Sequence, residues 1–172
     1  MTLGVTESVI DLVGNTPLLH LSRFAPPPLA GIYAKLEYFN PGGSVKDRAA
    51  LGMILDAERR GILKSGSTII EPTAGNTGIG LALIGVARGY RVILCMPRGY
   101  AVEKMKVIEA LGGEIEYLPK EAGMKGAIVK AHQLAAGIKG SFVPQQFENH
   151  SNPCFHEATT GREIIEQMAG HI

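Results

Sequence analysis

The sequence has no tryptophan and only two cysteines in 172 residues. The two cysteines cannot form a CxxC pair or a zinc site with four thiolates. Cys95 lies in the apolar run 92–96, where we expect a small, buried hydrophobic side chain. The five histidines show no metal-ligand spacing, so the sequence predicts no metal site.

Long hydrophobic runs and clusters of one charge sign are also missing. No segment approaches the ~20 apolar residues that a membrane span needs, and no basic region precedes an apolar stretch at the N-terminus. The formal net charge is +1, and the lysines and arginines are scattered, which is untypical of nucleic-acid or membrane binding. We therefore expect a cytoplasmic protein that acts on small molecules, without a nucleic-acid or membrane partner.

The sequence alternates short β-branched runs with longer segments of helical periodicity. Hydrophobic residues make up 45% of the chain and charged residues 19%, which is typical of a well-packed α/β protein. The alternation predicts βαβ units and therefore a parallel, doubly wound sheet. Gly61, Gly89 and Gly112 lie where C-cap glycines are expected. The predicted strands are 18–20, 32–37, 67–71, 91–96, 114–118 and 141–143, and the predicted helices are 45–60, 77–88, 101–111, 124–136 and 155–168.

The most informative stretch is 40–48 (NPGGSVKDR), a glycine-rich turn that runs into a helix with Lys46 in its first turn. The helix macrodipole disfavours a cation at this end, which favours the neutral amine that imine formation and proton transfer require. By position alone, however, an ion pair of Lys46 with Asp47 or another surface carboxylate is the favoured interpretation, because such pairs are common.

Two further stretches follow predicted strands. In 71–80 (EPTAGNTGIG), backbone amides and threonine hydroxyls converge on a helix N-terminus, which is suited to a carboxylate or phosphate. Its place at the carboxyl end of a central strand favours a ligand site, whereas the alternative is that Thr73 or Thr77 only caps the helix. The stretch 145–153 (QQFENHSNP) offers paired glutamines for a substrate carboxylate, but by itself it is typical of an ordinary loop.

Together these stretches resemble the cysteine synthase and cystathionine β-synthase family of fold type II pyridoxal-phosphate enzymes, which have a tryptophan synthase β-like fold. The resemblance runs nearly from end to end. It rests on ordered motifs: VGNTPLL (13–19), PGGSVKDR (41–48), EPTAGNTGIGLA (71–82), MP (96–97), EKMKVIEALGGE (103–114), QQFEN (145–149), and the later SNP and TTG.

The resemblance implies the cofactor pyridoxal 5'-phosphate and a role for each matched residue. Lys46 binds the cofactor covalently, is released when the substrate amine displaces it, and then removes the α-proton as a general base. Asn76 hydrogen-bonds the 3′ oxygen of the cofactor. Gln146 faces the substrate-carboxylate loop, which consists of Thr73, Ala74, Gly75 and Thr77, with Ala74 in place of the commoner serine.

The activity implied is β-replacement on O-acetyl-L-serine or L-serine with sulfide or homocysteine, giving L-cysteine or L-cystathionine. PGGSVKDR together with Ala74 suits homocysteine, or a relative that uses both nucleophiles, slightly better. Two alternatives remain open. One is a truncated, catalytically incompetent relative that serves binding or assembly, against which the joint retention of Lys46, Asn76 and Gln146 argues. The other is a serine or threonine deaminase, against which QQFEN argues.

The family continues for over a hundred residues beyond the matched part, with a phosphate-binding loop and a serine that faces the pyridine nitrogen. The resemblance therefore implies truncation before most of the second domain, in a family of homodimers. Residues 1–38 would pack on the missing second domain, 39–150 would form the small domain with the lysine and the substrate loop, and 151–172 would lead into the missing part. We expect exposed apolar side chains on the early strands.

Overall fold

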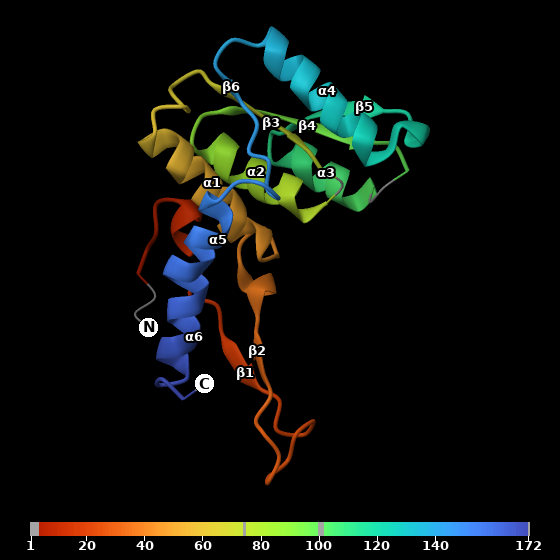
Figure 1. Ribbon diagram of the computed structural model, residues 1–172. Helices are drawn as coiled ribbons and strands as arrows, with labels where there is room; N and C mark the ends of the chain where they lie inside the picture. Colours follow the sequence, from red (N-terminus) through yellow and green to blue (C-terminus); the bar gives the residue numbers. More distant parts are fainter. Residues whose placement is uncertain (1–3, 74, 100–101, 172) are drawn as a thin grey trace.

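The computed structural model describes residues 4–73, 75–99 and 102–171, and its centre is a four-stranded parallel sheet (Figure 1). The strand order is β5-β4-β3-β6, so the chain runs outward from β3 to β5 and then returns to the other side of β3. This confirms the predicted doubly wound α/β fold. The strands are β3 (Thr68–Pro72), β4 (Arg91–Pro97), β5 (Glu114–Leu118) and β6 (Ser141–Phe142).

Helices cover both faces of this sheet (Figure 1). The strands β3 and β4 are buried on both faces because their side chains alternate between two hydrophobic clusters. Ile69 and Leu94 pack in the cluster with α1, α2 and α3, whereas Ile70 and Cys95 pack in the cluster with α4. Cys95 is fully buried, as expected. The helices are α1 (Lys46–Arg59), α2 (Asn76–Ala87), α3 (Val102–Ala110) and α4 (Gly123–Gly137).

Three glycines end the helices of the central sheet as the sequence predicts. Gly61 follows α1 with φ 68°, Gly89 follows α2 with φ 81°, and Gly112 follows α3 with φ 87°. Side chains other than that of glycine rarely adopt this left-handed conformation, so these residues allow the chain to leave each helix and enter the next strand. No helix in the described ranges is long and apolar enough to cross a membrane.

The two ends of the chain form a second part beside α1 (Figure 1). An antiparallel ribbon projects away from the sheet, and three of its apolar side chains, Leu19, Ile32 and Tyr33, are exposed. The predicted strand 32–37 is shorter in the structure because Glu37 begins a 3-10 turn. The elements here are η1 (Val9–Leu12), β1 (Leu18–His20), β2 (Tyr33–Lys35) and η2 (Glu37–Phe39). In the central part, η3 (Lys120–Ala122) precedes α4.

The C-terminal helical run lies against α1. It begins at Ser151, four residues before the predicted start, and consists of α5 (Ser151–His156), the π-helical turn η4 (Glu157–Gly161) and α6 (Arg162–Gln167). Gly52 of α1 makes this contact possible. A Cβ atom at Gly52 would lie 2.5 Å from the Cβ atom of Phe155, so α5 rests on bare backbone.

A buried ion cluster around Arg48 joins α1 to both ends of the chain. The Arg48 side chain is 1% exposed, and it pairs with Glu37 at 2.7 Å and with Glu163 of α6 at 2.6 Å. Thr16 donates a hydrogen bond to Glu37, and Lys35 donates one to Glu163. Burial raises the pKa of Glu163, but the hydrogen bonds from Arg48 and Lys35 outweigh it and lower the pKa to about 2. Both carboxylates are therefore held charged by one guanidinium.

We predict that Arg48→Leu lowers the free energy of unfolding by ~3–5 kcal/mol, because removing the guanidinium leaves Glu37 without a counter-charge and Glu163 with Lys35 alone. Urea unfolding followed by circular dichroism measures the change. Arg91→Gln is the matched control, since Arg91 pairs with Glu114 where both side chains are 52% exposed, and it should cost less than about 1 kcal/mol. Equal losses in the two variants would contradict a structural role for the Arg48 cluster.

Candidate active site

Lys46 is the first residue of α1, directly after the glycine-rich turn. The hydroxyl of Ser44 accepts the backbone N–H of Lys46 at 3.2 Å, and the Lys46 side chain is half-buried. Lys46 forms no ion pair within the described residues, so the ion pair expected from its position alone is wrong. Asp47 is fully buried instead, and one of its oxygens accepts the N–H of Gly42 at 2.6 Å. Burial raises the pKa of Asp47 to about 6 against this hydrogen bond.

The backbone of Lys46 lies directly against α2. A Cβ atom at Gly80 would lie 2.9 Å from the carbonyl oxygen of Lys46, so a residue larger than glycine has no room there. Gly80 lies about one helical turn after Asn76, the first residue of α2, whose side chain is exposed. The close approach of the two helices therefore places Lys46 beside the N-terminal turns of α2.

Two buried threonines flank the start of α2, one in the loop before it and one in its first turn. Thr73 accepts the N–H of Gly75 at 3.2 Å, and Thr77 donates its hydroxyl to the side-chain oxygen of Gln146 at 2.7 Å. The N-cap of α2 is Gly75, so the alternative that a threonine is the N-cap is wrong. Ala74 lies outside the described residues. The structure thus joins the predicted loop to its predicted partner through a direct hydrogen bond.

The two loops meet at the point where the chain reverses the direction in which it adds strands to the sheet. The loop 73–77 follows β3, the loop 143–146 follows β6, and these neighbouring strands run parallel. The next strand along the chain from β3 lies on its other side, so the connections diverge here. Open α/β sheets bind ligands outside the carboxyl ends of strands at such a switch point. With the exception of Ala74, the predicted site residues accordingly gather around the carboxyl ends of these strands.

Sequence reasoning missed two charged residues near this edge. Glu71 is 2% exposed, and its carboxylate accepts the backbone N–H groups of Gln145 and Gln146. The signal in the sequence that could have indicated Glu71 was its carboxylate at the end of the apolar run 68–71, which forms a buried strand. Lys104 of α3 has its amine 3.4 Å from the place of a Cβ atom on Gly75. It belongs to a segment of alternating lysines and glutamates that gave no indication of a site.

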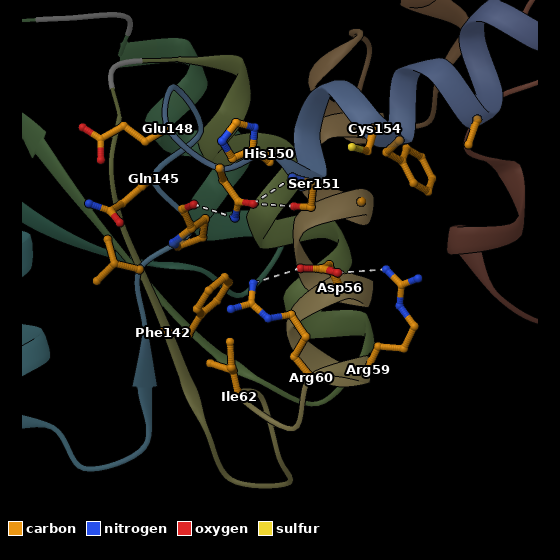
Figure 2. A pocket seen from close by; sticks show the side chains of 16 residues that line it. Asp56, Arg59, Arg60, Ile62, Phe142, Gln145, Glu148, His150, Ser151 and Cys154 are labelled. Atoms are coloured by element: carbon orange, nitrogen blue, oxygen red, sulfur yellow. Dashed lines mark hydrogen bonds and ion pairs between the residues drawn. The ribbon is translucent and has the colours of Figure 1, made fainter.

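A cavity of about 830 Å³ lies between the second half of α1, the loop after β6 and α5 (Figure 2). Its lining includes Gln145 but neither Lys46 nor Asn76. Three of its charged side chains pair with one another, since Asp56 binds Arg59 at 2.9 Å and Arg60 at 3.3 Å. In the part of the chain that the structure describes, no group of three histidine, cysteine or acidic residues could hold a metal ion.

The family model of the pyridoxal-phosphate dependent enzymes matches residues 9–172. The chain belongs to this family. The match covers the turn before Lys46, the α2 loop and the loop of Gln146 in one alignment, which is the set of segments that the structure brings together. The family assignment thus confirms the resemblance and, with it, the fold class and the cofactor of the family.

Several relatives of this pyridoxal-phosphate dependent chain are similar to it over almost its whole length. A probable cysteine synthase of Bacillus subtilis (strain 168) is 51% identical over 166 residues, which are 96% of this chain and 53% of that protein. The crystal structure of an O-ureido-L-serine synthase has a TM-score of 0.91 at 46% identity, over 97% of this chain and 52% of the other. That of an O-acetylserine dependent cystathionine β-synthase from Helicobacter pylori has a TM-score of 0.90 at 40% identity, over 98% and 55%. The chain spans about half the length of these relatives.

We predict that Gly80→Ala displaces α1 from α2 and lowers the free energy of unfolding by ~1–3 kcal/mol, because the added methyl group meets the Lys46 carbonyl. Thermal and urea unfolding measure the loss. Gly137→Ala is the matched control, since Gly137 is also helical but has no atom within 4 Å of its Cβ position, and alanine should be neutral or stabilising there. A Gly80→Ala protein as stable as the control would contradict the close approach.

Proposed function

We propose that this chain is the N-terminal part of an enzyme that performs β-replacement on O-acetyl-L-serine or L-serine with sulfide or homocysteine, giving L-cysteine or L-cystathionine. The observation that carries the proposal is the hydrogen bond between Thr77 and Gln146, which joins two loops beside Lys46 at the switch point of the sheet. The names of the relatives, cysteine synthase and cystathionine β-synthase, support the same reaction class.

The residues around α1 and α2 fit the reactive end of pyridoxal phosphate. The amine of Lys46 has no ion-pair partner in the described ranges and is therefore free to react with a carbonyl group. The missing side chain at Gly80 lets the Lys46 backbone approach the turn that starts with Asn76. Asn76 is exposed and can donate to an oxygen on the edge of the cofactor ring.

In the proposed mechanism this chain supplies binding, orientation and proton transfer. When bound, the cofactor would supply the electron sink for the bond that breaks at the substrate α-carbon. Lys46 would hold the cofactor and would take the α-proton as a general base. Thr73, Ala74, Gly75, Thr77 and Gln146 bind the substrate carboxylate, so that the α-carbon stays beside the Lys46 amine.

The proposed domain organisation follows from the same family membership. Residues 39–150 form the small domain that contains the site. Residues 1–38 pack on a second domain and residues 151–172 lead into it, and the exposed ribbon of Leu19, Ile32 and Tyr33 supports this division because exposed apolar clusters commonly mark a contact surface. We further propose that the whole protein is a cytoplasmic homodimer with small-molecule partners.

We predict that borohydride reduction of the chain with pyridoxal phosphate leaves a stable adduct on Lys46, located by mass spectrometry of the peptides. The visible absorbance of the unreduced mixture should disappear in Lys46→Ala, because Lys46 is the amine proposed to bind the cofactor covalently.

Lys104→Ala is the matched control for this experiment, since the Lys104 amine also lies beside the α2 loop. This variant should keep the adduct on Lys46. Labelling of Lys104 in the wild type, or equal labelling of several lysines, would overturn the assignment of Lys46.

A further inference from the structure

Glu71 is the last residue but one of β3 and places a carboxylate under the loop that contains Gln146. One oxygen accepts the N–H of Gln145 at 2.9 Å, and the other accepts the N–H of Gln146 at 3.2 Å. The residue is 2% exposed and has no ion pair within the described residues. A buried carboxylate without a cation is costly, so its two backbone partners are what makes it tolerable there.

The segment that Glu71 holds is strained. Gln145 has φ 52°, a left-handed conformation that residues other than glycine rarely adopt. The strained residue lies directly before Gln146, whose side-chain oxygen accepts the Thr77 hydroxyl at 2.7 Å. A chain of contacts therefore runs from Glu71 through the backbone of Gln145 and Gln146 to Thr77.

We propose that Glu71 is a positioning residue of the substrate-carboxylate site, which holds Gln145 and Gln146 from below so that the Gln146 side chain faces Thr77. The proposal rests on the proposed function, because that function gives Gln146 and Thr77 their substrate. Glu71 itself touches neither substrate nor cofactor and acts only through the loop.

Protonation of Glu71 weakens this hold. Burial raises the pKa of the Glu71 carboxyl to about 7, although the two N–H groups oppose the shift. Hydrogen bonds to an ionised acceptor are roughly twice as strong as those to a neutral one, so uptake of a proton loosens the loop. A cavity of about 140 Å³ beside Glu71 gives the proton a path.

Few other charges act on Glu71. The titratable groups near it are Cys95 on β4, His132 on α4 and Glu148 in the loop itself, and α2 carries no charged residue. A change in the Gln145 and Gln146 amides with pH reports every group near them, so the variant Glu71→Gln is needed to assign it.

The first test is ¹H–¹⁵N NMR of the wild-type chain between about pH 5.5 and 8.5. The amide resonances of Gln145 and Gln146 should follow one titration near pH 7, because their acceptor gains charge. Glu71→Gln should abolish it, whereas Glu116→Gln, a carboxylate on β5 that pairs with Lys130, should retain it. Amide shifts that stay flat in the wild type would overturn the proposal, whether or not the variant folds.

The second test is steady-state kinetics of the whole cofactor-loaded protein, of which we propose this chain to be the N-terminal part, with O-acetyl-L-serine and sulfide. Glu71→Gln should raise KM about tenfold, the effect of one weakened hydrogen bond to a charged group, with kcat changed less than about twofold. The wild-type KM should rise as the pH falls below 7, and that dependence should be lost in the variant. A fall in kcat without a change in KM would overturn the role of Glu71. A whole wild-type protein without turnover would overturn the proposed function, and the amide titration of the chain would still decide whether Glu71 holds the loop.

Discussion

The buried guanidinium of Arg48 is the interaction on which the rest of the structure depends. It lies two residues after Lys46 and binds Glu37 and Glu163, which are far apart in the sequence. Because a buried guanidinium needs its carboxylates and they need it, the position of α1 is fixed relative to both ends of the chain. The cluster therefore also fixes the position of Lys46, which we propose as the residue that binds the cofactor.

Two glycines allow α1 to pack closely against its neighbours. Gly80 admits the Lys46 backbone to α2, and Gly52 admits the Phe155 side chain of α5. The helix is therefore in close contact with two neighbouring helices, and in each contact one partner is a glycine without a side chain. At the sheet edge, Glu71 fixes Gln146 through backbone N–H groups. The groups proposed to touch substrate extend from this rigid support.

The periodicity of the sequence predicted most of the fold, and motif resemblance predicted the site. Strand β5 agrees with the prediction residue for residue, and the C-cap glycines lie where they were expected, because both depend on local rules. The predicted bounds of the early ribbon and of the start of α5 were less accurate. Glu37 leaves the strand to meet Arg48, and the helical run starts at Ser151, where Asn149 accepts its N–H. Such contacts join residues distant in sequence or depend on side-chain placement. Glu71, Gly80 and the conformation of Gln145 escaped prediction for the same reason.

The Arg48 cluster also constrains the order in which the molecule can assemble. Glu37 is only 11 residues from Arg48, whereas Glu163 is 115 residues away. Contacts that close long loops form slowly, because the chain must lose entropy before the contact stabilises it. The sheet and α1 can therefore fold with Glu37 as the first counter-charge, and docking of α6 completes the neutralisation. The helix α1, which contains Lys46, therefore reaches its final place only when α6 docks.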